Sequence, residues 1–150
     1  MNNANNLIRY TKFATLIFIA LVITADVFGF VITNYITRVW ADRTDTFALV
    51  MLSVVFYLGT IGAYAVLISL FRLLNNMSRD IVFDKANTRL MKIIAIACAL
   101  MGLDCFIGTI AWFGSVYCGV ICVFMTFIIL CVRAVFEKAI QMKSELDLTI

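Results

Sequence analysis

The stretch FALVMLSVVFYLGTIGAYAVLISLF, residues 47–71, decides the fold class of this chain. It holds 25 consecutive residues without a single charge. About 20 apolar residues are enough for a helix to cross the roughly 30 Å hydrocarbon core of a bilayer. A strand of a membrane barrel needs only about ten residues and alternates in polarity, so this run is too long and too uniformly apolar for one. The stretch therefore predicts a transmembrane helix.

Three further apolar runs flank this stretch, and the composition of the whole chain agrees with them. Of the 150 residues, 64% are hydrophobic and 14% are charged, whereas soluble domains average about 45–50% and about 25%. We expect a single domain of the all-α integral membrane class. Its four transmembrane helices should occupy about 13–36, 47–71, 90–113 and 116–136, with a cytoplasmic loop at 72–89 and a cytoplasmic tail at 137–150.

The distribution of lysine and arginine predicts the orientation of these helices. Ten basic residues fall in the N-terminal segment, the middle loop and the tail, which share one side of a protein with four spans. Only Arg38 and Arg43 fall in the connection on the other side. Cytoplasmic segments carry the excess of basic residues. We therefore expect both termini in the cytoplasm, with the fourth helix extended into it.

The most polar interruption of the apolar chain is IVFDKANTRLMKII, residues 81–94. Asp84 is expected to cap a helix that begins near Lys85, and Asn87 can hydrogen-bond back in the manner of a capping box. Arg89 and Lys92 would then lie near the phosphate headgroups. The segment is either only a helix start at the membrane edge or also part of an interaction surface.

Two short patterns resemble a known family. The pattern Phe83-Asp84-x-x-Asn87-x-x-x-Met91 lies between the second and third spans, and the chain closes on MKSELDLTI, residues 142–150. Both are similar to small bacterial membrane proteins grouped as domain of unknown function 2975, over nearly the whole chain. The resemblance implies four spans in the inner membrane and no established activity. It also implies that a small helix-turn-helix DNA-binding regulator is often encoded beside such a protein.

Two carboxyl groups are expected inside the membrane. Asp26 lies fourteen residues after Lys12, and Asp104 lies twelve after Lys92, so parallel helices place both at similar depth. An ionised Asp at the bilayer centre costs roughly 2.5–3.5 kcal/mol on insertion scales, and no cationic residue lies at that depth. We expect both to face the interior of the bundle, at least one of them protonated. They form either a proton- or cation-responsive site or a hydrogen-bonded link between helices. Candidate partners are Thr24, Thr109 and Tyr64.

Signals of enzyme chemistry and of metal binding are absent from the sequence. There is no histidine, no glycine-rich phosphate loop and no nucleophile elbow. The five cysteines lie in apolar runs and form no CxxC pair, so we interpret them as small buried hydrophobic residues. We expect neither catalysis, nor a cofactor or metal, nor direct nucleic-acid binding.

The predicted tail carries a repeating apolar pattern. Its members recur at i, i+4, i+7 and i+11, which is one face of a helix, and such a face in water needs a partner. It could lie along the membrane surface or pack on the middle loop. We expect instead that tail and loop form one cytoplasmic interaction surface, made of Phe83, Asp84, Asn87, Arg89, Val135, Ala139, Met142 and Leu146.

The predicted function is that of a non-enzymatic regulatory or interaction protein. It would bind a cytoplasmic partner, and the helix-turn-helix regulator implied by the resemblance is the candidate that it would sequester. Two alternatives stay open: a small proton- or cation-coupled transporter that uses Asp26 and Asp104, and a structural subunit of a membrane complex. Besides the lipid bilayer and the cytoplasmic protein, a second copy of the chain is a candidate partner.

Overall fold

A computed structural model describes residues 2–79, 81 and 84–147, with side chains from residue 6 to residue 146 of these ranges. All of the secondary structure in these residues is helical, in the order α1 (Asn2–Val27), α2 (Gly29–Tyr35), η1 (Ile36–Trp40), α3 (Thr46–Met77), α4 (Lys85–Gly108) and α5 (Ser115–Asp147). Four stretches are long and apolar enough to cross a membrane: Asn6–Val27, Thr46–Met77, Lys85–Gly108 and Ser115–Leu146. The chain is therefore all-α and has the character of a multi-pass membrane protein.

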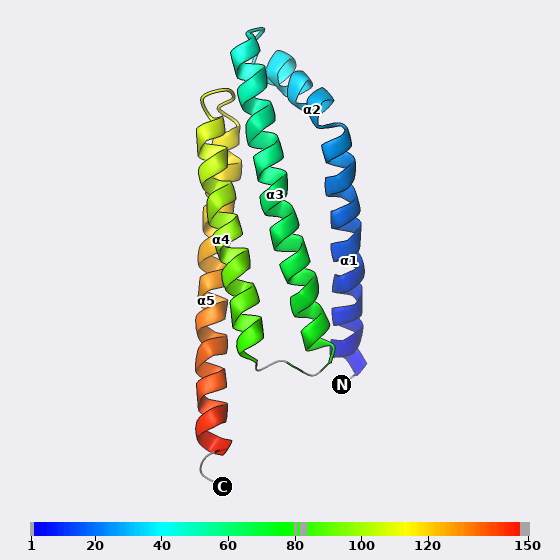
Figure 1. Ribbon diagram of the computed structural model, residues 1–150, viewed down its shortest axis with the longest axis vertical. Coiled ribbons are helices and arrows are strands. Elements are labelled where there is room, and N and C mark those ends of the chain that lie inside the picture. Colours follow the sequence, from blue (N-terminus) through cyan, green and yellow to red (C-terminus); the bar gives the residue numbers. More distant parts are fainter. Residues whose placement is uncertain (1, 80, 82–83, 148–150) are drawn as a thin grey trace.

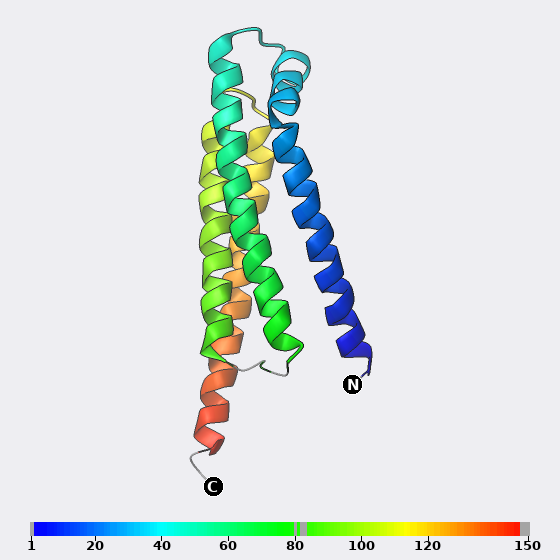
Figure 2. The same cartoon turned by 45° about the vertical axis from the view of Figure 1, so that its right-hand side comes forward.

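The four long helices α1, α3, α4 and α5 run along the longest axis of the molecule in alternating directions (Figures 1 and 2). In this arrangement α1 packs on α3, α3 on α4, and α4 on α5, whereas the backbones of α1 and α5 do not approach one another in the described ranges. The two termini and the α3–α4 connection lie at the same end of the molecule (Figure 1), which we call the terminal end. The last turns of α5 reach beyond the start of α4 at this end.

The first span differs from the predicted helix over 13–36. The helix α1 ends at Val27, and α2 then bends over the end of α3 (Figure 1). A Cβ atom at Gly29 would lie 2.8 Å from both the Phe56 ring and the Tyr57 hydroxyl, so a larger residue there would have to displace these two side chains. The fully buried Thr33 shares a hydrogen bond of 3.0 Å with Ser53 and fixes α2 there.

Beyond α2, the π-helical segment η1 ends in a tight reversal. The backbone at Asp42 has a φ of 49°, a left-handed conformation that aspartate tolerates better than most residues. Asp45 then caps α3 by accepting a hydrogen bond from the Ala48 amide at 3.1 Å. Arg43 pairs with Asp45 at 2.9 Å and also donates to the Ile110 carbonyl oxygen at 2.9 Å, so it ties this connection to the α4–α5 turn.

The α3–α4 connection is shorter than the predicted loop over 72–89. The helix α3 continues to Met77 and α4 begins at Lys85, which confirms the predicted start of that helix. Asp84 is its N-cap and accepts from the Ala86 amide at 2.7 Å. Residues 72–77, which the prediction placed in the loop, are helical, because their basic and amide side chains end the apolar pattern without ending the helix.

Candidate functional site

The first carboxyl group in the spans belongs to Asp26, in the last turn of α1. The Tyr64 hydroxyl donates to Asp26 Oδ2 at 2.7 Å, and the Tyr57 hydroxyl lies 3.5 Å from the Asp26 carbonyl oxygen. Asp26 Oδ1 is buried and has no hydrogen-bond partner among the described residues. Because Tyr57 and Tyr64 are seven residues apart, they lie on one face of α3. Asp26 therefore joins α1 to that face.

The second carboxyl group, that of Asp104 in α4, meets a different face of α3. Its Oδ2 is buried, has no hydrogen-bond partner in the part of the chain that the structure describes, and lies 3.6 Å from the position that a Cβ would take at Gly59. Gly59 is two residues from Tyr57, and at about 100° per residue it points away from the face that meets Asp26. The structure thus gives each carboxyl its own surroundings, and no hydrogen bond among the described residues joins the two.

Of the three partners suggested by the sequence, only Tyr64 bonds to a carboxyl. The Thr24 hydroxyl donates to the Ala20 carbonyl oxygen and the Thr109 hydroxyl to the Phe106 carbonyl oxygen, each within its own helix. Threonines in apolar helices commonly satisfy themselves in this way. A threonine hydroxyl lies close to its own helix and reaches a carbonyl oxygen one turn back, whereas the ring of Tyr64 carries its hydroxyl out to the neighbouring helix.

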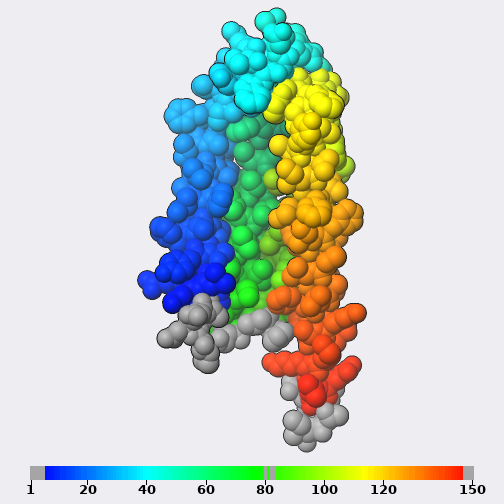
Figure 3. Space-filling model, turned by 180° about the vertical axis from the view of Figure 1, so that it is seen from behind, coloured from blue at the N-terminus to red at the C-terminus, as the bar shows by residue number. Residues whose placement is uncertain are grey.

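Asp104 also lines an apolar cavity of about 300 Å³ between α1, α3, α4 and α5. Seen from behind, the surfaces of α1 and α5 stand apart, and α3 is visible between them (Figure 3). Asp104 is the only charged residue among those that line this cavity, and Asp26 does not line it. The cavity wall is otherwise formed mainly by small and apolar side chains such as Ala25, Val55 and Ala63.

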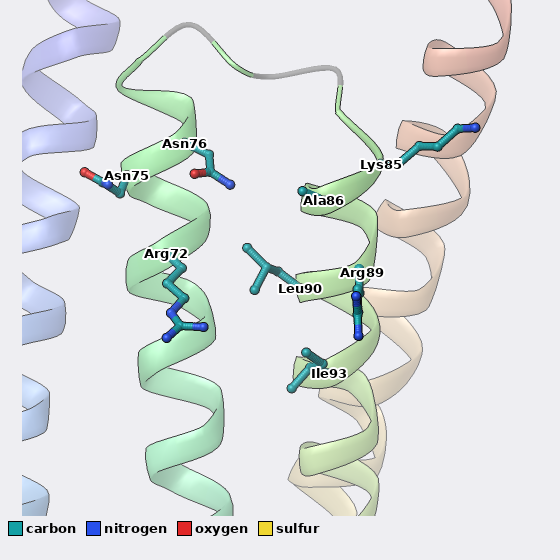
Figure 4. A pocket seen from close by; sticks show the side chains of 8 residues that line it. All are labelled: Arg72, Asn75, Asn76, Lys85, Ala86, Arg89, Leu90 and Ile93. Carbon is teal, nitrogen blue, oxygen red and sulfur yellow. The ribbon is translucent and has the colours of Figure 1, made fainter.

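A network of amide side chains fastens the helices at the terminal end. Asn87 in α4 is fully buried, at 0% exposure; it accepts from Asn76 at 2.8 Å and donates to the Ile81 carbonyl oxygen at 2.7 Å. On the other side of α3, the Lys12 ammonium of α1 donates to Asn75 at 3.1 Å. Figure 4 shows the neighbouring Asn75 and Asn76 pointing to opposite sides of α3. This pair of asparagines therefore links α3 to α1 and to α4.

The network borders a basic cavity of about 600 Å³ between the end of α3 and the start of α4 (Figure 4). Arg72 lies across the cavity from Leu90 and Ile93, which project toward it from α4. The described residues that line it include three basic side chains and no acidic one. They are Arg72, Asn75, Asn76, Lys85, Ala86, Arg89, Leu90 and Ile93. In the described ranges the ion pairs are Arg43–Asp45 and Arg133–Glu137, so the three cations of the cavity are unpaired there.

The predicted interaction surface is only partly exposed. Asp84 and Arg89 are exposed, but Asn87 is an interior residue that holds α4 to α3. Its amide is used in the bonds to Asn76 and Ile81, so the side chain of Asn87 is not available at the surface in this structure. Phe83 lies outside the described residues.

The four tail residues lie on α5. Val135, Met142 and Leu146 are 66%, 59% and 67% exposed, and Ala139 is half-buried. The Arg133 guanidinium pairs with Glu137 one turn later at 2.7 Å, which supports the helix across the point where the apolar run ends.

Comparison with known proteins identifies the chain by one family model. The model described as "Protein of unknown function (DUF2975)" matches residues 13–150 and so includes the α3–α4 connection, both carboxyls and the tail. Neither a curated protein nor a solved structure matched. The match confirms the resemblance inferred from the two short patterns.

Proposed function

The chain belongs to the DUF2975 family of proteins of unknown function, and from this premise we propose that it is a non-enzymatic interaction protein of the bacterial inner membrane. Its terminal end faces the cytoplasm and binds a regulatory protein there. The partner is a small helix-turn-helix regulator, which is held at the membrane and away from DNA. The basic residues of the N-terminal segment and of the α3–α4 connection support this proposal, as does the length of α5.

The orientation rests on charge. Ten of the twelve basic residues fall in segments that meet at the terminal end or on the last turns of α5, and basic residues are retained on the cytoplasmic side. Single cysteines at Asp42 and Ser144, in a background without the native cysteines, test the orientation with an impermeant thiol reagent. We expect Asp42→Cys to label in intact spheroplasts and Ser144→Cys only after lysis. Labelling of Ser144→Cys from outside would reverse the topology.

The observation that carries the proposal is the length and exposure of α5. Its 33 residues measure about 50 Å, whereas the hydrocarbon core spans roughly 30 Å. The residues after Arg133 therefore extend into water, where Val135 and Met142 remain largely exposed. An apolar helical face in water is stabilised by a protein partner that covers it, as in helix-in-groove recognition.

The test is copurification of a candidate regulator with matched variants of α5. The regulators to be co-expressed are helix-turn-helix proteins encoded near the gene. Met142→Asp places a charge on the apolar face, and Gln141→Asp places the same charge on the adjacent residue, which is also exposed. We expect Met142→Asp to reduce the bound regulator at least tenfold, the effect of about 1.4 kcal/mol, and Gln141→Asp to leave it nearly unchanged.

A chain that ends at Phe136 extends the same test. It removes the last turns of α5 while keeping the apolar run, so we expect it to insert and to lose the regulator. Equal retention of the regulator by the truncated chain and by the full chain would exclude the tail as its docking surface.

A second function, proton- or cation-coupled transport, is favoured by the intramembrane carboxyls. Asp26 bonded to Tyr64 and Asp104 in an apolar cavity each carry one buried oxygen without a partner. Ionisable groups in such positions commonly mark ion pathways. The test is substrate-driven pH change in proteoliposomes with the native chain and with Asp26→Asn. Flux lost in Asp26→Asn, with no copurifying regulator, would favour transport over the interaction protein.

A further inference from the structure

We propose that the basic cavity between α3 and α4 binds the phosphate group of an anionic phospholipid. The site is formed by Arg72 and Arg89 with Lys85 at its rim, and by the apolar side chains of Leu90 and Ile93. The inference concerns this cavity only and does not depend on the partner protein proposed above.

The charges of the cavity favour an anion. Among the described residues, Arg72, Lys85 and Arg89 line it, no acidic residue does, and none of the three forms an ion pair. The Lys85 ammonium points away from the cavity in Figure 4, so the two arginines carry the binding. A guanidinium presents a planar pair of N–H donors that fits two phosphate oxygens. A bound phosphate would satisfy donors of both arginines.

The walls of the cavity are held in place by hydrogen bonds. Its two walls are the last turns of α3 and the first turns of α4, which the hydrogen bond between Asn76 and the buried Asn87 holds at a fixed spacing. Asp84 accepts from the Ala86 amide and fixes where α4 begins. The arginines on opposite walls therefore start from positions set by buried bonds, which lowers the entropy lost when an anion binds.

The apolar side of the cavity distinguishes a lipid from a free anion. Leu90 and Ile93 project into the space one and two turns further along α4 than Lys85 and Ala86 (Figure 4). From there α4 continues as an apolar span to Gly108. A phosphate held by the arginines would therefore sit at the membrane edge with its acyl chains along the apolar part of α4. Basic pockets between transmembrane helices bind anionic headgroups in this way.

The experiment is native mass spectrometry of the full-length protein in detergent, titrated with phosphatidylglycerol or with phosphatidylcholine of the same acyl chains. We expect phosphatidylglycerol to be retained at least tenfold more tightly. Arg72→Gln with Arg89→Gln should lose about tenfold in affinity, the effect of one lost charged hydrogen bond. The lysine pair, Arg72→Lys with Arg89→Lys, should lose less, because it keeps the charge and removes only the paired donors.

Arg79→Gln is the matched control, since Arg79 is exposed at the same end but does not line the cavity. It should bind as the native chain does. Equal binding of the two lipids, or an equal loss in Arg79→Gln and in the double glutamine variant, would overturn the proposal. A third arm adds inorganic phosphate and glycerol phosphate. If either displaces phosphatidylglycerol at low millimolar concentration, the site takes a free phosphate and the lipid assignment is wrong.

Discussion

The contact between α4 and α5 and the contact between α1 and α3 are built by different means. Gly102 and Gly119 let α4 and α5 approach so closely that a Cβ on either residue would lie within 3.4 Å of the backbone carbonyl oxygen of the other. By contrast, α1 is held at the α3 side by side-chain hydrogen bonds from Lys12 to Asn75 and Ser78 and from Tyr64 to Asp26. The comparison teaches that α4 and α5 are joined by close backbone packing, whereas the contact between α1 and α3 relies more on individual side-chain hydrogen bonds.

The largest expected effect comes from breaking the α4–α5 contact. In Gly119→Ile the new side chain meets Phe106 Cε1 at 3.0 Å and the Gly102 carbonyl oxygen at 3.2 Å from its Cβ alone. A backbone oxygen yields only if the helix moves, so we expect a loss of about 3 kcal/mol in the free energy of unfolding, the upper range for overpacking. Unfolding in bicelles by steric trapping measures it.

Gly59→Ala is the control for that substitution. Its added Cβ would meet only Asp104 Oδ2, at 3.6 Å, which is an ordinary contact. We expect a change within roughly 0.5 kcal/mol. A similar loss in both glycine variants would show that the close approach at Gly119 does not explain the first result.

The next effect concerns the bond that closes the terminal end. Asn87→Leu leaves the Asn76 amide and the Ile81 carbonyl oxygen without their partner. An unsatisfied buried group costs about 1–3 kcal/mol, so we expect a loss of about 2 kcal/mol. Hydrogen exchange should rise in the first turns of α4. In Asn75→Leu, which loses the bond from Lys12 instead, exchange should rise in α1. If hydrogen exchange rose in the same helix in both variants, Asn87 would not hold α4 separately from the bond by which Asn75 holds α1.

A smaller effect tests the fastening of α1 within the membrane. Tyr64→Phe removes the donor to Asp26, and hydrogen bonds between transmembrane helices contribute about 0.6 kcal/mol on average. Asp26→Asn keeps an acceptor oxygen and should be nearly neutral, and combining it with Asp104→Asn should leave folding intact. Expression and the free energy of unfolding measure both. Failure of the double asparagine variant to fold would show that a charged carboxyl is needed.

The smallest effect is a dependence on pH at the opposite end. The hydrogen bond from Arg43 lowers the pKa of Asp45 below its usual value. A lowered folded-state pKa stabilises the protein above the unfolded-state pKa, and this stabilisation is lost as the pH falls through the folded-state pKa. Between pH 6 and strongly acidic pH, the melting temperature of the native chain should therefore fall slightly more than that of Asp45→Asn. A loss of equal size in both would assign the acid sensitivity to other groups.

Local patterns in the sequence were enough to predict the spanning helices and the start of α4. Uncharged runs such as residues 47–71 predict a spanning helix because crossing a bilayer depends on length and polarity alone. Asp84 predicts the start of α4 because a cap is made with the residues that directly follow it. The family was likewise recognised from short patterns around Asp84 and Asn87.

What neighbouring residues cannot determine is how each helix is rotated about its own axis, and only the tertiary structure decided that. Asn87 looks like an exposed polar residue in the sequence but is buried against Asn76 of α3. Asp26 and Asp104 were expected at similar depth, and the structure shows that they meet different faces of α3. Arg72 and Arg89 line one cavity because α3 and α4 pack side by side. Helical spacing determines which residues share a face, but packing between helices determines what that face meets.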